Sequence, residues 1–352
     1  MNASVWKGIL KYGLGLALLA YVIARNWEPS GSGPGLAEAL RKPVQWRPLA
    51  LAGLFLAGGV LGTLVRWWLL VRAQGLPFPL SGALRLGLVG YFFNSLLPSS
   101  IGGDIVKAVA IARGQNRRTV AVATVLFDRA VGLWGLFWLA ALLGGGLWLA
   151  GDPVLLDNAG LFALVRSTWV VVAATLVGWL LLGLLSDHRA HRFAGRLGLI
   201  PKAGHALAEC WRAVWLYRRR PGAVTLSLLL TLVCHSSCVL SFYVAARVFV
   251  SAAELSRLPS LVEHGLIVPM GMGIQALFPA PGGVGGGEYG YGKLYALLGR
   301  PEAYGVLASL AQRVLSWGIG VAGYLGCLLW RPAARPAGEP EPQPVAAGVI
   351  ES

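Results

Sequence analysis

Six long apolar stretches limit what this chain can fold into. A helix that crosses a bilayer needs about 20 mostly apolar residues. Charged residues make up only 13% of the chain, about half the share of a soluble domain. We therefore predict an all-α polytopic integral membrane protein. The predicted spans are Trp6–Ala24, Pro48–Leu70, Val120–Ala150, Leu161–Leu185, Val224–Val250 and Ala303–Trp330.

Two further apolar regions are broken by proline and glycine. The segment LLPSSIGGD interrupts the region 84–112, and FPAPGGVGGGE interrupts the region 261–298. Irregular backbone at membrane depth survives only inside protein or beside a water-filled cavity. We therefore predict a re-entrant helical hairpin in each region, in addition to the six spanning helices. A hydropathy plot would count about eight transmembrane segments.

The charges predict how the chain is oriented in the membrane. Positive residues favour cytoplasmic loops, so the basic segment 187–220 is expected inside and the acidic loop 151–160 outside. The hairpin 84–112 then enters from the cytoplasm, the hairpin 261–298 enters from outside, and both termini are cytoplasmic. The expected location is the cell inner (cytoplasmic) membrane. The formal net charge of +15 is explained by this orientation, so no nucleic-acid partner is expected.

Two segments lie outside this scheme of spans and hairpins. The segment 187–220 alternates apolar and basic residues, which is typical of an amphipathic helix pair on anionic lipid. The tail 331–352 is rich in proline and is predicted to be a disordered cytoplasmic segment.

The two hairpin regions repeat one another. In each, an amide side chain precedes a proline by four residues, and a glycine pair and a carboxylate follow. The spacing from the carboxylate to a downstream arginine is 25 residues in both regions, and the spacing from an upstream arginine to the proline is 32 residues. The first region carries Arg66, Asn94, Pro98, Asp104 and Arg129, and the second carries Arg247, Gln275, Pro279, Glu288 and Arg313.

The repeat divides the chain into halves, 1–150 and 151–330. Each half holds three spans and one hairpin, and an odd number of crossings makes the halves point in opposite directions. This inverted-topology repeat is typical of secondary transporters, whose sites lie at interrupted helices. The first half holds two spans, the cytoplasm-side hairpin and a third span. The second holds two spans joined by the basic segment, the outside hairpin and the last span.

The motifs LLPSSIGGDIVKA, LFDRAVGL and FPAPGGVGGGE resemble the flippase-like transmembrane region of the lysylphosphatidylglycerol synthases. The resemblance covers about residues 6–330 and implies a protein that moves lipids between leaflets. Implied substrates are phospholipids, aminoacyl-phospholipids and lipids linked to a polyprenyl phosphate. The sequence departs from the family at Asp104, where many members have glutamate, and at Lys107, where arginine is common. No aminoacyl-transfer domain follows residue 330, so lysyl-lipid synthesis is not expected.

The polar residues of the two repeats form the predicted substrate site. Two interpretations of Arg129 and Arg313 stay open: they contact a lipid phosphate, or they pair with Asp104, Asp128 or Glu288 and hold the hairpins. Asp104 and Glu288 are each expected to cap the helix that leaves the tip. The full predicted set is Asn94, Gly102, Gly103, Asp104, Lys107, Asp128, Arg129, Gln275, Gly282, Gly283, Glu288 and Arg313.

Three other cations have simpler interpretations. Lys107 contacts a headgroup or, as we favour, extends to the interface with its ammonium in water. Arg66 and Arg247 are interpreted as interface anchors at the ends of spans. Histidine, cysteine and carboxylate residues show no ligand spacing, so no metal and no cofactor are expected.

The favoured function is lipid transport without enzymatic chemistry, with membrane lipids as the partners. One alternative is a lipid-modifying membrane enzyme that uses Asp104 or Glu288 as a base. Another is a non-catalytic membrane partner of a separate synthase or glycosyltransferase. A catalytic cluster of nucleophile, base and orienting group is not visible in the sequence, which favours transport.

Overall fold

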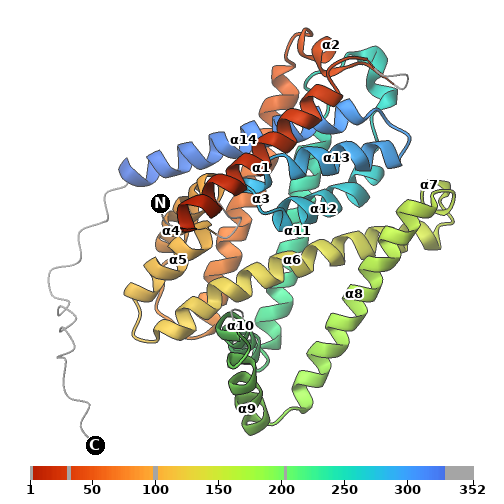
Figure 1. The fold of residues 1–352 in the computed structure, drawn as a ribbon. Coiled ribbons are helices and arrows are strands. Elements are labelled where there is room, and N and C mark those ends of the chain that lie inside the picture. The colour runs from red at the N-terminus through yellow and green to blue at the C-terminus, as the bar shows by residue number, and fades with distance from the viewer. Residues whose placement is uncertain (1–2, 30–32, 98–101, 202–203, 330–352) are drawn as a thin grey trace, which may run out of the picture.

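The computed structural model describes residues 3–29, 33–97, 102–201 and 204–329. The tip proline Pro98 and the predicted disordered tail 331–352 lie outside these ranges. The described chain is helical, as predicted, and forms a bundle whose long helices cross one another (Figure 1). Five of its helices are long and apolar enough to cross a membrane: α3 (Trp46–Ala73), α6 (Arg118–Leu149), α8 (Ala159–Leu184), α11 (Pro221–Ala245) and α14 (Glu302–Leu329).

The first predicted span is also a helix, α1 (Ala3–Arg25). It is not among the five that meet both the length and the hydropathy requirement over the described residues. The count of six spanning helices therefore stays a prediction. The second, third, fourth, fifth and sixth predicted spans each correspond to one of the five long helices.

Two pairs of shorter helices occupy the predicted hairpin regions. The first pair is α4 (Leu80–Leu96, 17 residues) and α5 (Gly102–Arg113, 12 residues). The second is α12 (Leu261–Leu277, 17 residues) and α13 (Gly286–Leu297, 12 residues), with the short 3₁₀ turn η2 (Pro281–Gly283) between them. A 12-residue helix is about 18 Å long, too short for a hydrocarbon core of about 30 Å. The second helix of each pair is therefore too short to cross the core alone. The two pairs also match in length, helix by helix.

The outer ends of each pair lie together. In the first pair, the Gln115 side chain beyond α5 donates to the carbonyl of Pro77 before α4, at 2.7 Å. In the second, Arg300 beyond α13 contacts Glu263 at the start of α12, with 3.3 Å between Nη2 and Oε1. The outer ends of each pair are therefore in contact, and the re-entrant course of the two pairs stays a prediction.

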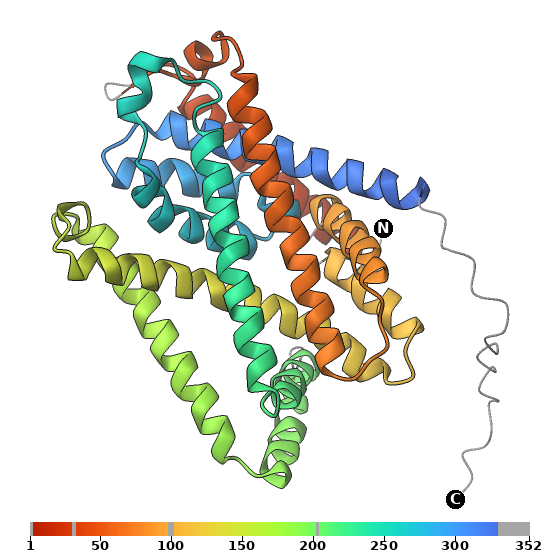
Figure 2. The same cartoon turned by 180° about the vertical axis from the view of Figure 1, so that it is seen from behind.

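The centre of the bundle is formed by α3 and α11, which lie side by side (Figure 2). Small residues let the two backbones approach closely, as is usual for helix pairs in membranes. The Ser241 hydroxyl donates to the carbonyl of Ala52, and the Ser237 hydroxyl donates to that of Phe55, both at 2.7 Å.

The long helix α6 follows the first short pair, and α14 follows the second. Each short pair packs against both α6 and α14. The pair α4–α5 contacts α6 through α5, and α4 contacts α14. The pair α12–α13 contacts α14 through α13, and α12 contacts α6. This arrangement is reciprocal between the two halves of the chain. One difference is α8, which extends away from the bundle and meets it through α6 (Figure 1).

The loops gather at two ends of the bundle. At one end, Lys42, which follows α2 (Leu36–Leu40), pairs with Glu254 of the 3₁₀ helix η1 (Ala252–Arg257) at 2.7 Å. At the same end, α7 (Pro153–Leu156) precedes Asn158, whose side chain donates to the carbonyl of Leu297.

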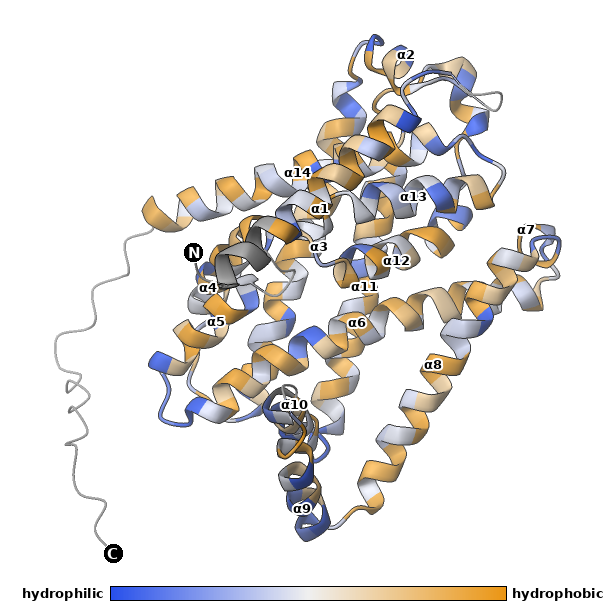
Figure 3. Ribbon diagram, viewed as in Figure 1, coloured by the Kyte–Doolittle hydropathy of each residue, from blue (hydrophilic) through white to orange (hydrophobic). Residues whose placement is uncertain are grey.

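The basic segment 187–220 lies at the opposite end and forms the predicted helix pair. It contains α9 (Asp187–Gly198) and α10 (Gly204–Tyr217). Figure 3 shows α9 as a mostly hydrophilic helix beside the apolar α8. The Trp211 indole donates to the carbonyl of Ala190 at 3.0 Å, which fastens the two helices together. The position of this pair at a membrane surface stays a prediction.

Candidate functional site

The tip of the second pair is an irregular turn held by side chains. Gly282 and Gly283 both have positive φ, 55° and 67°, a conformation that glycine adopts without steric cost. The amide of Gln275 donates to the carbonyl of Gly282 at 3.0 Å. Arg313 donates to the carbonyls of Gly282 (2.9 Å) and Gly283 (3.3 Å). Gln275 and Arg313 thus satisfy backbone acceptors that the broken helix leaves free.

Glu288 joins this tip to α14. Its Oε1 accepts from Nε of Arg313 at 2.6 Å, and its Oε2 accepts from Nη2 of the same guanidinium at 3.1 Å. Oε2 also accepts from the backbone N–H of Gly285 at 2.8 Å, so Glu288 caps α13 as predicted. Ser309 contacts Oε1 at 3.4 Å. The carboxylate is fully buried, and it is held by Arg313, Gly285 and Ser309.

The first pair is closed by a similar amide contact. The backbone N–H of Gly103 donates to Oδ1 of Asn94 at 2.8 Å. A Cβ atom at Gly103 would lie 1.7 Å from the carbonyl oxygen of Gly90, so α4 and α5 touch backbone to backbone. Gly102 is also buried, and a Cβ there would lie 2.4 Å from the side chain of Leu97. Both glycines therefore serve close packing.

A chain of buried charges links α5, α6 and α3. Arg129 pairs with Asp104 at 2.6 Å, and Lys107 lies 3.4 Å from the same carboxylate. Lys107 also lies 3.9 Å from Asp128, which pairs with Arg66 at 2.8 Å. Charges buried in this way are stable only when they are paired and hydrogen-bonded.

Two interpretations of cations are corrected by this chain. Lys107 does not extend to the interface: it is 7% exposed, and its ammonium also lies over the ring of Trp67, 4.7 Å from the centroid. Arg66 is not an interface anchor either, since it is 4% exposed and also donates to Thr231 at 2.8 Å. Both cations were close to helix ends in the sequence but face the bundle interior. The guanidinium of Arg247 instead stacks on the ring of Tyr243, with 3.5 Å between Cζ and the ring centroid. Its interpretation as an interface anchor stays a prediction.

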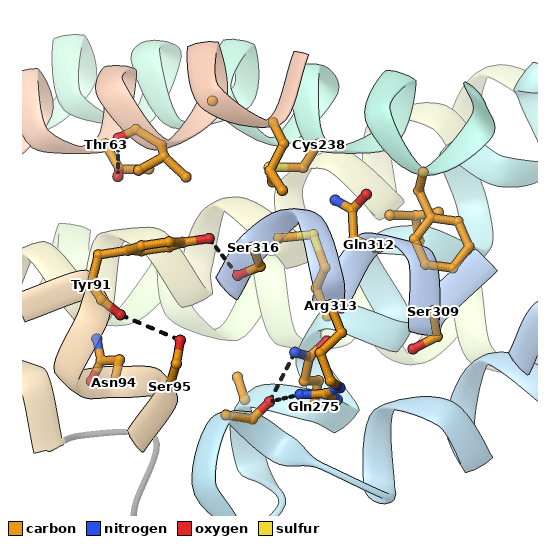
Figure 4. Close-up of a pocket in the computed structure, with 18 of the residues that line it drawn as sticks. Thr63, Tyr91, Asn94, Ser95, Cys238, Gln275, Ser309, Gln312, Arg313 and Ser316 are labelled. Atoms are coloured by element: carbon orange, nitrogen blue, oxygen red, sulfur yellow. Dashed lines mark hydrogen bonds between the residues drawn. The ribbon is translucent and has the colours of Figure 1, made fainter. Parts of the chain in front are cut away.

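A cavity of about 380 Å³ lies between α3, α11, α14 and the inner ends of α4 and α12. Its size falls in the range of about 300–1,000 Å³ that is usual for small-molecule sites. Figure 4 shows side chains from both short pairs and from α14 around this space. The residues of the predicted set that line it are Asn94, Arg129, Gln275, Gly282 and Arg313.

The other seven predicted residues do not line the cavity but lie behind its wall. Glu288 and Asp104 hold the two arginines, Asp128 and Lys107 extend the charge chain, and the remaining three are the packing glycines Gly102, Gly103 and Gly283. The predicted set therefore comes together in space, but its carboxylates do not line the cavity.

Several lining residues were missed from the sequence. The Tyr91 and Ser316 hydroxyls lie 2.6 Å apart and join α4 to α14 across the cavity wall (Figure 4). Gln312 accepts from Ser241 at 2.9 Å. The signal for Gln312 was available, since it occupies in the second repeat the place that Asp128 occupies in the first. Tyr91 and Ser316 carry no such signal.

Metal-ligating side chains do not cluster in the part of the chain that the structure describes. His264, which enters α12, has both ring nitrogens occupied: Nδ1 lies 2.8 Å from the carbonyl of Ser260, and Nε2 lies 2.7 Å from the Tyr295 hydroxyl. The polar groups that line the cavity are two arginines, three amides, the imidazole of His235 and several hydroxyls.

The fold and the site define a polytopic helical membrane protein with a cavity, lined by both apolar and polar side chains, between two broken helix pairs. The chain belongs to the lysylphosphatidylglycerol synthase TM region family, whose sequence profile matches residues 8–323. The resemblance carried by the tip motifs is thereby confirmed. Comparisons with curated proteins and with solved structures gave no match.

Proposed function

We propose that the protein is a flippase-like transporter that moves a charged or glycosylated lipid between the leaflets of the inner membrane. The observation that carries this proposal is the cavity, which Arg129 of one repeat and Arg313 of the other line together among helices long and apolar enough to span a membrane. Charged side chains at such a site suit a headgroup that has to pass through hydrocarbon.

The proposed architecture is an inverted repeat with two re-entrant hairpins. The equal helix lengths of the two pairs and their reciprocal packing on α6 and α14 support it. In this arrangement the termini are cytoplasmic, and the two tips meet near the membrane midplane. Rocking of one half against the other would then open the cavity to each side in turn.

A second surface feature, a groove between α5 and α6, supports lateral access of a lipid from the bilayer. A groove of about 530 Å³ runs along α5 and α6. Asp104 lies in its lining, and so do Arg113 and Arg118, which flank the loop between the two helices. The apolar side chains of Ile105 and Val109 are 59% and 47% exposed there. The acyl chain of a lipid would fit the apolar part of this groove, and the phosphate of the same lipid would lie near Arg113 and Arg118.

The positions of the carboxylates support transport over catalysis. An enzyme would use Asp104 or Glu288 as a base, but Arg129 and Lys107 hold the first, and Arg313 and the cap of α13 hold the second. Pairing with a cation favours the ionised carboxylate, which makes it a weaker base for a substrate proton. A separate synthase or glycosyltransferase is the proposed source of the lipid.

The test is lipid exchange in proteoliposomes. The purified full-length protein is reconstituted with a trace of a fluorescent anionic phospholipid, and the fraction open to a quencher outside the vesicles is followed over time. We expect exchange above that of empty liposomes. A converted lipid seen by mass spectrometry, without exchange, would instead establish the enzyme.

A blocking variant sharpens this test. Ser316→Trp places a large ring in the cavity and should stop exchange, because Ser316 lines it. The matched control is Gly318→Trp, two residues further along α14, where an added Cβ atom would meet nothing within 4 Å. Exchange that survives Ser316→Trp would show that lipid does not pass through this cavity.

A further inference from the structure

The charged groups that line the cavity are of one sign. Among the described residues that form its wall, the ionised side chains are Arg129 and Arg313. The side chain of Arg129 is 26% exposed and that of Arg313 is 6% exposed, and both line the cavity. A headgroup in this cavity therefore meets positive charge.

The nearby carboxylates are turned away from the cavity. Glu288 has no exposed surface, and its oxygens contact Arg313, Gly285 and Ser309. Asp104 and Asp128 are 8% and 6% exposed and are held by the cations around them. An ammonium group in the cavity would find none of these three carboxylates on the wall.

The charge cluster behind the wall also favours an anion. Four cationic side chains face three carboxylates, which leaves an excess of one positive charge. Charges inside a membrane protein interact strongly, because little water screens them. An anionic ligand would balance the cluster, and a cationic one would add to its excess.

The rest of the polar wall is neutral and suited to hydroxyl groups. The hydroxyls of Thr63, Ser95 and Ser316 and the amide of Gln312 surround the space (Figure 4). His235 also lines it, and its Nε2 lies 2.9 Å from the carbonyl of Gly132. The carbonyl can only accept, so Nε2 carries the proton and Nδ1 of the neutral ring is an acceptor. This Nδ1 has no partner among the described residues.

We infer that the cavity selects an anionic headgroup with free hydroxyls, such as a glycerol phosphate or a glycosyl phosphate, and disfavours the same headgroup carrying a cationic aminoacyl ester. The arginines match the phosphate, since the guanidinium fork suits it, and the neutral wall matches the hydroxyls. This inference rests on the proposed function for its transport meaning, but the binding preference belongs to the cavity itself.

Binding and exchange are measured separately so that the two proposals fail separately. Thermal unfolding of the full-length protein is measured in an uncharged detergent with added short-chain phosphatidylglycerol, its lysyl ester or phosphatidylcholine. We expect phosphatidylglycerol to raise the melting temperature at a concentration about tenfold lower than the lysyl ester does, because the positive cavity attracts the anion and repels the ammonium groups of the lysyl ester. The same lipids are then compared for exchange in proteoliposomes.

The outcomes are distinct. Equal or better stabilisation by the lysyl ester overturns the inference. Preferential binding of phosphatidylglycerol without exchange of either lipid overturns the proposed transport and leaves the inference on the cavity in place. Exchange that is faster for the lysyl ester keeps transport and overturns the inference.

An isosteric variant locates the preference in the cavity. Gln312→Glu adds one negative charge to the wall and keeps the oxygen that accepts from Ser241. It should reduce the preference for phosphatidylglycerol over the lysyl ester about tenfold. Gln45→Glu makes the same change at the exposed start of α3 and should leave the preference unaltered. An unaltered preference in Gln312→Glu would place the anion elsewhere on the basic protein and overturn the inference.

Discussion

Arg313 and Glu288 form the same ion pair in the second half of the chain that Arg129 and Asp104 form in the first. Both pairs join residues 25 positions apart, and both are 2.6 Å long. The two pairs differ in their surroundings. Arg313 also binds two carbonyls of its tip, and its side chain is 6% exposed, against 26% for that of Arg129. We therefore assign Arg313 mainly to the tip.

The first prediction concerns the pair Arg313–Glu288. Arg313→Gln leaves Glu288 buried without its cation, which should cost about 3–5 kcal/mol of stability and lower both yield and melting temperature. Glu288→Gln should do the same for the opposite reason. The measurement is thermal unfolding of the purified variants in detergent.

The double variant decides what the pair does. If it is structural, replacing both residues removes the unpaired charge, and much of the stability should return. Lipid exchange should return with it. A double variant that is stable but does not exchange lipid would show that Arg313 serves the headgroup directly, contrary to the assignment above.

The second prediction concerns Arg129. Arg129→Gln should reduce exchange at least about tenfold, and Arg129→Lys should keep part of it, because lysine retains the charge but loses the fork. Asp104 still contacts Lys107 at 3.4 Å, so the loss of stability should be smaller than for Arg313→Gln. Exchange rates and melting temperatures are compared on the same preparations. Equal exchange in Arg129→Gln and the wild type would remove Arg129 from the site.

The third prediction concerns the contact between α4 and α5. Gly103→Ala would bring a methyl group within 1.7 Å of the carbonyl oxygen of Gly90, so the two helices must separate, at a cost of about 1–3 kcal/mol or more. Gly178→Ala in α8 is the control, since a methyl group there meets nothing within 4 Å. Melting temperatures should fall for the first and hold or rise for the second. The reverse order would contradict the helix contact.

The ion pairs were foreseeable from the sequence because their residues stand out. In an apolar segment, a proline, a glycine pair or an arginine is rare enough for its spacing to be informative. The matching distances from Asp104 to Arg129 and from Glu288 to Arg313 therefore identified both pairs as one of two open interpretations. The same contrast located the ends of the short helices to within a few residues.

The neutral wall of the cavity could not be found in this way. Tyr91 and Ser316 lie 225 residues apart, and single hydroxyls in apolar helices are common. Only the packing of α4 on α14 brings them together. Lys107 and Arg66 show a second limit: their places near helix ends suggested water, but burial depends on which neighbouring helix covers a side chain.

The fourth prediction concerns the loop pair Lys42–Glu254. The hydrogen bond from Lys42, and then that from Ser251, lowers the pKa of Glu254 from 4.5 to about 2. A lowered folded-state pKa stabilises the fold above pH 4.5, and this stabilisation is lost as the pH falls through about 2. The melting temperature of Glu254→Gln should therefore lie below that of the wild type at pH 7, with a gap that narrows below pH 4.5. A gap independent of pH would show that the charge is not involved.

The last prediction concerns topology and needs a chain with single cysteines. Cys210, Cys234, Cys238 and Cys327 are first replaced by alanine, and lipid exchange is checked. Single cysteines are then placed at exposed loop positions and treated with a thiol reagent that does not cross membranes. Glu28 and Ala253 represent the end predicted outside, and Gly195 represents the basic segment predicted inside.

Pro77 and Gly114 carry the decisive comparison, because they flank the α4–α5 pair on its two sides in the chain. If the pair enters and returns, both positions lie on one side of the membrane, as the contact between Gln115 and Pro77 supports. Both should then react only after permeabilisation, like Gly195, while Glu28 and Ala253 react on intact cells. If the pair crosses, Pro77 and Gly114 lie on opposite sides. Reaction of Pro77 on intact cells with protection of Gly114 would therefore refute the hairpin, and the inverted repeat with it, because the first half would then contain an even number of crossings.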